Sequence, residues 1–517
     1  MAITQAKLES KLWDAANALR GAMDAADYKN YVFPVLFWKW ISDNWELEHQ
    51  KFLADVEGQE LDEASLAEVE ADYHIFTVPD GTRWSQIFRN EDVPADIAED
   101  KTHKLNPSTY LGIRVKHAMD LIAQSNSDRL ANIFGDVHYA NQERLPESAL
   151  IGLLKPFDEV SLDRENAPGD LMGAAYEYLL KRFADDAGQK AGEFFTPRSV
   201  VHLITRLLKP QENETVYDPT SGTGGMLIES VAAVEADGGD ARTLSLYGQE
   251  KNLTTQSIAR MNMYIHNLPD HNIMRGDTLR EPKFTERDAL KKFDVVIANP
   301  PFSVSDWGVE KWKGDKVLGD TPPNSYADLA FLQHMIASMK PETGRIGVVM
   351  PHGVLFRGHA EQRIREAIIR KDLIEAVIGL PNKIFYGTGI PSCLLILRAK
   401  KSEERKNKIL FVDASSRFEK GKNMNLFRDS DVKAILKAFH EEKDVDGAGQ
   451  GIEFASIGLE EVKKNNYDLT IGRYVAANTD VEIDTETALA EFTESVIAAD
   501  KSRATMLDLL KGAGFDV

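Results

Sequence analysis

The sequence predicts an α/β protein: a mainly parallel sheet, preceded by a helical N-terminal domain and followed by a helical C-terminal tail. Three observations lead to this expectation. Short β-branched runs alternate with helical stretches from about residue 171, as in a parallel sheet covered on both faces. Apolar residues before position 150 follow helical spacing instead. The acidic end of the chain carries one further helical stripe.

The first 150 residues are expected to form the helical domain. Leu8, Leu12 and Leu19 recur at helical spacing, and four of the seven tryptophans fall within the first 45 residues. These aromatic residues favour a helical core or a subunit interface, and an aromatic platform for nucleic acid is the alternative. A further helix is expected around 107–123, and residues 158–170 are expected to be a linker.

Seven strands are expected in the alternating region, at TVYDP, LSLYGQE, NIMRGD, FDVVIANP, RIGVVMP, IEAVIGL and CLLILRA. Helices are expected at LMGAAYEYLLKRFA, after Thr196-Pro197, and at 225–236, 252–266, 327–339 and 360–370. Thr196 and Pro197 are expected to be the N-cap and first turn of their helix. The last two strands have no clear helix between them, which predicts an antiparallel pair at one edge of the sheet.

Composition limits the possible classes of protein. The 517 residues are 43% hydrophobic and 28% charged, and no apolar run is long enough to span a membrane. The start of the chain lacks a signal peptide's pattern, and the single cysteine, Cys393, fits a reducing cytoplasm. The net charge of −21 has the wrong sign for a protein that binds DNA by itself, because contacts to phosphates come from Lys and Arg. Either DNA is not the partner, or another protein supplies most of the basic surface.

A glycine-rich turn, DPTSGTGG, follows the first strand and precedes a helix. Glycines there allow a tight turn and a close approach to a ligand. The acid at the strand end suits a ligand with a cationic amino group better than a pyrophosphate, and the chain has no phosphate-loop motif. A plain tight turn is the alternative. The candidate binding residues are Asp218, Ser221, Gly222, Thr223 and Gly224.

Two further acids follow the next two strands. Glu250 is placed to hydrogen-bond ribose hydroxyls, which indicates a nucleoside without saying which one. Asp277 could accept from an adenine amino group, and a turn-forming role is the alternative.

The chemistry is expected at Asn299, Pro300, Pro301 and Phe302, where the apolar strand FDVVIA ends. Two prolines stiffen the backbone and remove two N–H donors, so carbonyl oxygens face the site. The Asn299 amide oxygen and a proline carbonyl can accept both hydrogens of an exocyclic amine, and Phe302 can stack on the base. No metal is expected, because the twelve histidines show no zinc-like spacing with the cysteine.

Taken in order, GEFFTPRS, DPTSGTGG, GQEKN, GDTL and IANPPFS resemble the motifs of amino-methyltransferases of the γ arrangement. With the helical N-terminal region and the run NNYDLTIGRYV, the chain resembles the modification (M) subunit of type I restriction-modification systems. The resemblance implies a Rossmann-like methyltransferase sheet and adenine-N6 methylation of double-stranded DNA. It also implies S-adenosylmethionine as cofactor, held by Ser221 to Thr223, Glu250 and residues Glu193, Phe194, Phe195, Thr196, Pro197 and Arg198, with Asp218 and Asp277 bordering the pocket.

The resemblance further implies a specificity (S) subunit, a restriction (R) subunit and two M subunits per complex. The expected division is a helical domain at 1–150, a methyltransferase domain at 151–478 and a tail at 479–517. Only 42 residues separate Phe302 from the RIGVVMP strand, too few for a sequence-recognition domain, so recognition is expected to lie in a partner. The tail helix is expected to dock on this chain's own body or on a partner.

Two other functions compete with this interpretation. The same pocket could methylate glutamine in a protein, or RNA, although the aromatic-rich helical region and the tail argue against a compact enzyme of that kind. A scaffold that binds the cofactor without transferring its methyl group is the second alternative, and the intact 299–302 motif argues against it.

Overall fold

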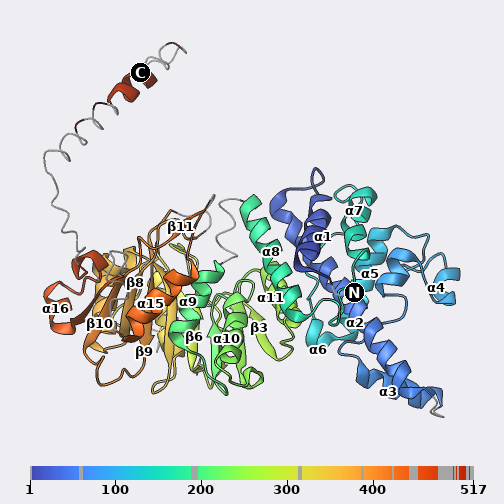
Figure 1. Cartoon of the computed structure of the whole chain (residues 1–517), viewed down its shortest axis with the longest axis horizontal. Helices are drawn as coiled ribbons and strands as arrows, with labels where there is room; N and C mark the ends of the chain where they lie inside the picture. Colours follow the sequence, from blue (N-terminus) through green and yellow to red (C-terminus); the bar gives the residue numbers. More distant parts are fainter. Residues whose placement is uncertain are drawn as a thin grey trace. The chain divides into compact units, whose positions relative to one another are not determined.

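The structure is a computed structural model that describes residues 3–57, 62–187, 196–312, 317–385, 389–421, 424–441 and 452–475, together with 493, 497, 500–507 and 512. The chain divides into two compact units, Met1–Val475 and Ala476–Val517. The larger unit contains the N-terminal helices and the sheet (Figure 1).

A nine-stranded sheet lies at the centre of the larger unit, in the order β13-β10-β8-β9-β7-β6-β1-β2-β3. Its pairs are parallel except for β7–β9, β8–β9 and β10–β13, which confirms the expected mainly parallel α/β fold. The strands are β1 (Thr215–Asp218), β2 (Ser245–Glu250), β3 (His271–Arg275), β6 (Val295–Ala298), β7 (Arg345–Pro351), β8 (Ile374–Gly379), β9 (Ser392–Arg398), β10 (Lys408–Asp413) and β13 (Glu453–Gly458). Two small hairpins pair β4 (Thr285–Glu286) with β5 (Ala289–Leu290) and β11 (Glu419–Lys420) with β12 (Asn425–Leu426).

Helices cover both faces of the sheet, because alternate residues of the buried strands point to opposite sides. Val216 packs with α9 and α10, whereas its neighbour Tyr217 packs with α12 and α14. The helices are α9 (Arg198–Leu208), α10 (Gly225–Ala236), α11 (Leu253–Ile265), α12 (Asp328–Ser338), α13 (Gly353–Phe356), α14 (His359–Arg370), α15 (Asp429–Glu441) and α16 (Leu459–Lys464).

The antiparallel pairing of the last two expected strands, β8 and β9, is confirmed, but their expected position at an edge is wrong. β9 inserts between β8 and β7, and β10 and β13 extend the sheet beyond β8. These two strands are not among the seven expected from the sequence. β10 has four consecutive buried residues and could have been recognised, whereas β13 has no fully buried residue.

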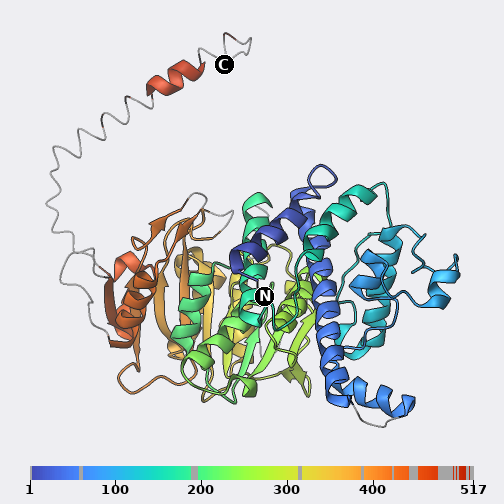
Figure 2. The ribbon, with the colours of Figure 1, turned by 45° about the vertical axis from the view of Figure 1, so that its right-hand side comes forward.

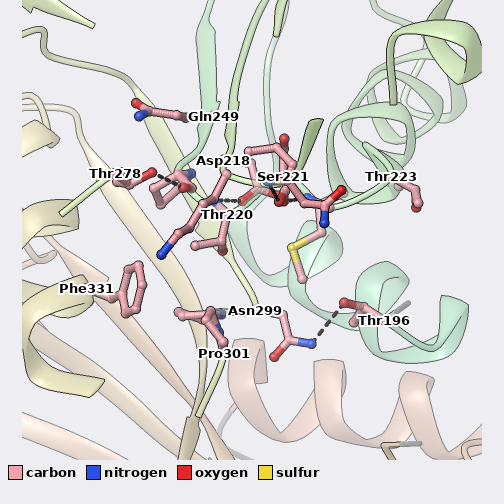
Figure 3. Close-up of a pocket in the computed structure, with 18 of the residues that line it drawn as sticks. Thr196, Asp218, Thr220, Ser221, Thr223, Gln249, Thr278, Asn299, Pro301 and Phe331 are labelled. Atoms are coloured by element: carbon pink, nitrogen blue, oxygen red, sulfur yellow. Dashed lines mark hydrogen bonds between the residues drawn. The ribbon is translucent and has the colours of Figure 1, made fainter. Parts of the chain in front are cut away.

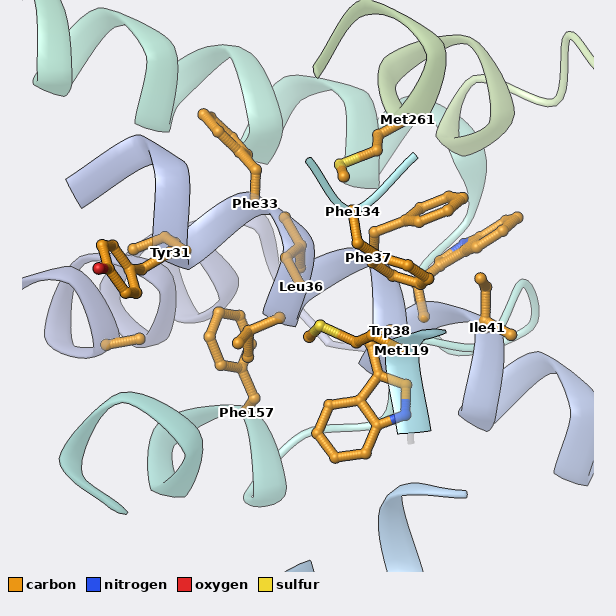
Figure 4. Close-up of a cluster of buried hydrophobic side chains, with 14 of the residues drawn as sticks. Tyr31, Phe33, Leu36, Phe37, Trp38, Ile41, Met119, Phe134, Phe157 and Met261 are labelled. Carbon is orange, nitrogen blue, oxygen red and sulfur yellow. The ribbon is translucent and has the colours of Figure 1, made fainter. Parts of the chain in front are cut away.

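The N-terminal region forms the expected helices: α1 (Gln5–Asn17), α2 (Tyr28–Val56), α3 (Glu63–Tyr73), α4 (Ala95–Glu99), α5 (Leu111–Ser125), α6 (Ser127–Leu130), α7 (Glu147–Asp158) and α8 (Gly169–Ala187). Trp38 and Trp40 are buried in a hydrophobic core, which confirms the core interpretation for these two rings. Figure 4 shows Trp38 within this core. Met261 and Tyr264 of α11 belong to the same core, so the helical region packs on α11 beside the β3 edge of the sheet (Figures 1 and 2).

The expectation of a linker at 158–170 is wrong, because this segment is packed against α2. Lys39 Nζ donates to the Val160 carbonyl at 3.0 Å, and the Leu162 N–H donates to Asp43 at 2.7 Å. The Leu162 side chain is fully buried. Polar and small residues in the sequence suggested a free connection, but buried polar side chains of α2 hydrogen-bond its backbone instead.

The smaller unit is helical at residues 500–507. Of the expected apolar stripe, Met506 lies in this helix and is 54% exposed, whereas Leu489, Phe492, Val496, Ala499 and Leu510 lie outside the described residues. No helix in the described part of the chain combines the length and the apolar composition of a membrane span.

Candidate functional site

A cavity of about 960 Å³ lies at the carboxyl ends of β1, β2, β3 and β6 (Figure 3). In an open α/β sheet this edge is where ligands bind. The turn after β1 and residues 299–302 after β6 both line the cavity, although 81 residues separate Asp218 from Asn299. They meet because β1 and β6 are neighbouring parallel strands.

The turn after β1 is held by backbone hydrogen bonds. Asp218 accepts from the Thr220 N–H at 2.9 Å, the Ser221 N–H donates to the Gln249 carbonyl at 3.0 Å, and the Gly222 N–H donates to Glu250 at 3.1 Å. Ser221, Gly222 and Thr223 line the cavity. The glycine-rich turn expected to bind a ligand therefore faces the cavity.

Gly224 differs in its surroundings from Ser221, Gly222 and Thr223 of the same turn. Its φ of +83° requires glycine, and an added Cβ would lie 2.7 Å from the Met263 side chain on α11. Gly224 is not among the residues that line the cavity. A side chain there would therefore disturb the packing between the turn and α11 before it reached a ligand.

Asp218 is buried at the end of β1. Burial, with a smaller contribution from the negative charge of Glu250, raises the pKa of Asp218 to about 7, although the Thr220 N–H opposes this shift. Among the described residues, no Lys, Arg or His forms an ion pair with Asp218. A cationic group brought into the cavity would lower this pKa and be attracted by the carboxylate.

The other two selected acids also line the cavity. Glu250 accepts from the Gly222 and Asn252 N–H groups, at 3.1 and 2.8 Å. Asp277 accepts from the Leu279 N–H at 3.2 Å and pairs with Lys251 at 2.9 Å. Asp277 therefore forms the turn that the sequence analysis offered as one alternative, and it borders the cavity as well.

Asn299 follows β6 and lies on the cavity wall (Figure 3). Its Nδ2 donates to the Thr196 hydroxyl at 3.0 Å, and the part of the chain that the structure describes supplies no donor to its Oδ1. This contact fixes the amide plane and leaves the oxygen available as an acceptor. Asn299 Nδ2 and the Thr196 hydroxyl join segments 103 residues apart.

The prolines and Phe302 complete the motif after β6. Pro300, Pro301 and Phe302 line the cavity, and the half-buried Phe302 ring meets Phe385 edge to face at 6.3 Å. The next residue, Ser303, donates its N–H to Asp328 at 2.7 Å, so the start of α12 anchors the loop. The motif therefore lines the cavity, and the hydrogen bond from Ser303 to Asp328 holds its loop in place.

The segment before α9 differs from its expected form. The helix begins at Arg198 with Pro197 in the N-cap position, so Thr196 lies outside the helix and contacts Asn299 instead of capping it. The expectation of Thr196 as N-cap is therefore wrong. Thr196 and Arg198 line the cavity, Pro197 does not, and Glu193, Phe194 and Phe195 lie outside the described residues.

Aromatic residues that the sequence analysis did not select also line the cavity: Trp307, Phe331 and Phe385. Phe331 lies on α12 and Phe385 follows β8, so no local motif connects them to the strand ends. Trp307 lies five residues after Phe302, so its position close to the 299–302 motif is the signal in the sequence that could have indicated it.

Comparison with known proteins identifies the family. The family model of the N-6 DNA methylase matches residues 167–482, and that of the HsdM N-terminal domain matches residues 8–157. The methylase subunit of the type I restriction enzyme MpnII from Mycoplasma pneumoniae is 30% identical, with 92% of this chain and 90% of that protein covered. The MjaVII methylase subunit from Methanocaldococcus jannaschii is 31% identical, with 94% of this chain and 81% of that protein covered.

Among solved structures, the type I restriction-modification system methyltransferase subunit from Streptococcus thermophilus is similar with a TM-score of 0.75 and 29% identity. The match covers 92% of this chain and 100% of that one. The chain therefore belongs to the N-6 DNA methylase family and, within it, to the methylase subunits of type I restriction enzymes, which makes it an adenine-specific DNA methyltransferase.

Proposed function

We propose that this chain transfers a methyl group from S-adenosylmethionine to N6 of an adenine flipped out of duplex DNA, at sites chosen by a separate specificity subunit. The observation that carries the proposal is that the turn after β1 and residues 299–302 line a single cavity at the carboxyl edge of the sheet. A base acceptor and a nucleoside cofactor can meet there.

The residues around the turn fit S-adenosylmethionine. Ser221 Oγ is buried and has no hydrogen-bond partner among the described residues, and the buried Asp218 carboxylate lies in the same wall. A ligand with hydroxyl and cationic amino groups would satisfy both. We assign Asp218, Ser221 to Thr223, Glu250 and Asp277 to the cofactor, with residues 193–198 alongside. When bound, S-adenosylmethionine supplies the electrophilic methyl group.

The residues after β6 would hold the target base. Asn299 Oδ1 and a proline carbonyl accept the two hydrogens of the adenine amine, which draws the nitrogen toward tetrahedral geometry and exposes its lone pair. Thr196 keeps the Asn299 amide in the orientation that this task needs. Phe302 offers a stacking face, and base–aromatic stacking of about 1–3 kcal/mol offsets much of the cost of flipping a base.

The net charge of −21 supports a role for a partner in DNA binding. Phosphate contacts require Lys and Arg, so a specificity subunit would supply much of the DNA contact as well as the sequence choice. The proposed complex holds two copies of this chain per specificity subunit, and a restriction subunit cleaves. In it, residues 1–150 serve assembly, 151–478 catalysis and 479–517 partner docking.

The test is a methyl-transfer assay with radiolabelled S-adenosylmethionine and duplex DNA, with and without the co-expressed specificity subunit. We expect label in N6-methyladenine only when the partner is present. Label in protein or RNA would move the chain to another class of methyltransferase. Absence of label in every substrate, with cofactor binding intact, would make it a scaffold.

A second experiment tests the docking role of the tail. A chain that ends at residue 479 should keep its thermal stability and its affinity for S-adenosylmethionine but lose co-elution with the specificity subunit. Full co-elution of the shortened chain would contradict the assignment.

A further inference from the structure

The pair of helices α2 and α3 carries a cluster of side chains that the proposed reaction does not use. α3 projects at the end of α2, away from the sheet (Figures 1 and 2). None of the described residues of α3 is buried, so apolar packing holds this helix only weakly. Polar contacts from His49 and Glu48 on α2 to Glu70 on α3 and to His74 at its end join the two helices instead.

Three ligand atoms converge in this cluster. His49, Glu70 and His74 each offer one ligand atom, and these three atoms all lie within 4.8 Å of one another. Glu70 Oε1 is 2.6 Å from His49 Nδ1 and 3.4 Å from His74 Nε2. Two imidazoles and one carboxylate are a donor set that zinc-type ions prefer, whereas calcium and magnesium prefer oxygen ligands alone.

A second observation concerns the other nitrogen of His74. His74 Nδ1 lies 3.2 Å from Glu48 Oε2, which also accepts from the Ile75 N–H, and Arg164 pairs with the same carboxylate at 3.4 Å. In the neutral tautomer whose Nδ1 hydrogen is donated to Glu48, His74 Nε2 presents its lone pair on the side of Glu70 Oε1, where an ion can accept it. A carboxylate that orients a histidine in this way is the usual outer support of a metal-bound imidazole.

The rings are also held in place by Trp45. The His49 and His74 imidazoles each stack on its indole, with centroid distances of 4.9 Å and interplanar angles of 11° and 10°. Rings on opposite faces would have planes roughly 7 Å apart, so the close approach of their nitrogens places both on one face. Arg83 lies over the same indole, with its guanidinium carbon 4.3 Å from the ring centroid. The two imidazoles are thus aligned before any ion binds.

We infer that His49, Glu70 and His74 bind one divalent transition-metal ion of the zinc type, which clamps α3 onto α2. Three protein ligands leave one position of a tetrahedral ion for water. The site lies on the helical domain and is independent of methyl transfer, so its ion would stabilise structure.

The test uses the full chain, freed of its purification tag and treated with chelator. Zn²⁺ is titrated calorimetrically, and Co²⁺ is titrated by its visible absorption, which reports tetrahedral nitrogen and oxygen ligands. We expect one ion per chain. His49→Ala and Glu70→Gln should abolish the Co²⁺ spectrum, and Glu48→Gln should weaken Zn²⁺ binding about 10–100-fold through its effect on His74.

His202→Ala is the matched control. His202 Nδ1 lies 2.6 Å from Glu229 Oε1, the same separation as in the His49–Glu70 pair, but this pair has no third ligand in the described part of the chain. Binding should be unchanged in this variant. A wild-type affinity for Zn²⁺ in His49→Ala, or no binding by the wild-type chain, would overturn the inference.

Hydrogen exchange provides a readout that does not depend on affinity. Zn²⁺ should slow exchange of the α3 amides in the wild-type chain and in His202→Ala, but not in His49→Ala or in His49→Gln, which keeps a polar side chain of similar size. Equal exchange of α3 with and without Zn²⁺ in the wild-type chain would show that no clamp forms.

Discussion

The helical domain and the carboxyl edge of the sheet both bury polar groups, but they satisfy them differently. Lys39 on α2 donates to both carboxylate oxygens of Asp43 and to the Val160 carbonyl, and Asp43 also accepts the Leu162 N–H. At the sheet edge, Asp218 has no cationic partner among the described residues.

This difference separates the polar residues that stabilise the fold from those that can bind a ligand. A buried ion pair whose hydrogen bonds are complete has no interaction left to offer a ligand. Removing one member of the pair leaves the other charge buried and uncompensated. A buried carboxylate without a cationic partner, or a buried hydroxyl without a hydrogen-bond partner, lowers stability but remains able to interact with a ligand in the cavity it faces. Substitutions that break the buried Lys39–Asp43 pair of α2 should therefore destabilise the chain, and substitutions at the sheet edge should leave it folded and impair its function.

The largest expected effect is from Lys39→Met, which leaves Asp43 buried and unpaired. We expect the free energy of unfolding to fall by about 3–5 kcal/mol. Urea denaturation measures the change. Lys51→Met is the control: Lys51 pairs with Glu165 at 2.7 Å, but both side chains are more than half exposed, so its loss should be less than about 1 kcal/mol. Equal losses in the two variants would remove the contrast on which the comparison depends.

Asn299→Ala should have the next largest effect, on rate alone. Loss of one preorganised acceptor is expected to slow methyl transfer about 10²–10³-fold, with the free energy of unfolding and the cofactor affinity nearly unchanged. Single-turnover transfer by the complex with the specificity subunit measures it. Asn272→Ala, on the exposed β3 edge of the same sheet, should transfer at the wild-type rate. A normal rate in Asn299→Ala would exclude Asn299 from the reaction.

The pH dependence of cofactor binding tests Asp218. Burial and Glu250 raise the pKa of Asp218 to about 7, and a cationic amino group binds the ionised form better. Binding must therefore release the proton that Asp218 holds below pH 7. Affinity for S-adenosylmethionine should fall roughly fiftyfold from pH 7 to pH 5, as the ionised fraction of such a group falls. Calorimetry across this range measures the slope.

Asp218→Asn should bind the cofactor weakly with little pH dependence, and a flat wild-type profile would contradict the assignment. Stability follows the same linkage. The folded chain holds this proton more tightly than the unfolded chain, so in the absence of ligand Asp218 lowers the free energy of unfolding as pH rises from about 4 to 7.

The smallest expected effect is from Thr196→Val, which removes the hydroxyl that orients Asn299. One hydrogen bond contributes about 0.5–1.5 kcal/mol, so the transfer rate should fall about tenfold or less. Thr196→Ser keeps the hydroxyl and should restore the rate, which separates positioning from packing. A larger loss in Thr196→Ser than in Thr196→Val would mean that the methyl group of Thr196 matters more than its hydroxyl.

The sequence alone determined the fold class, seven of the nine strands of the sheet, and the two motifs at the strand ends. Periodicity and strand-end motifs are local features, and neighbouring parallel strands bring their carboxyl ends together. Asp218 and Asn299 could therefore be placed at one edge before the structure was known. The β10 and β13 strands were missed, the 158–170 segment was taken for a linker, and Thr196 was taken for a helix cap.

Only the tertiary structure decided which distant groups meet. It placed the Thr196 hydroxyl on Asn299, the Leu162 backbone on Asp43, and Phe331 and Phe385 in the cavity wall. It also brought His49 within reach of Glu70 and His74, which the spacing of histidines relative to the single cysteine had not suggested. Contacts of this kind depend on how whole helices and strands pack against one another, and no short stretch of sequence contains that information.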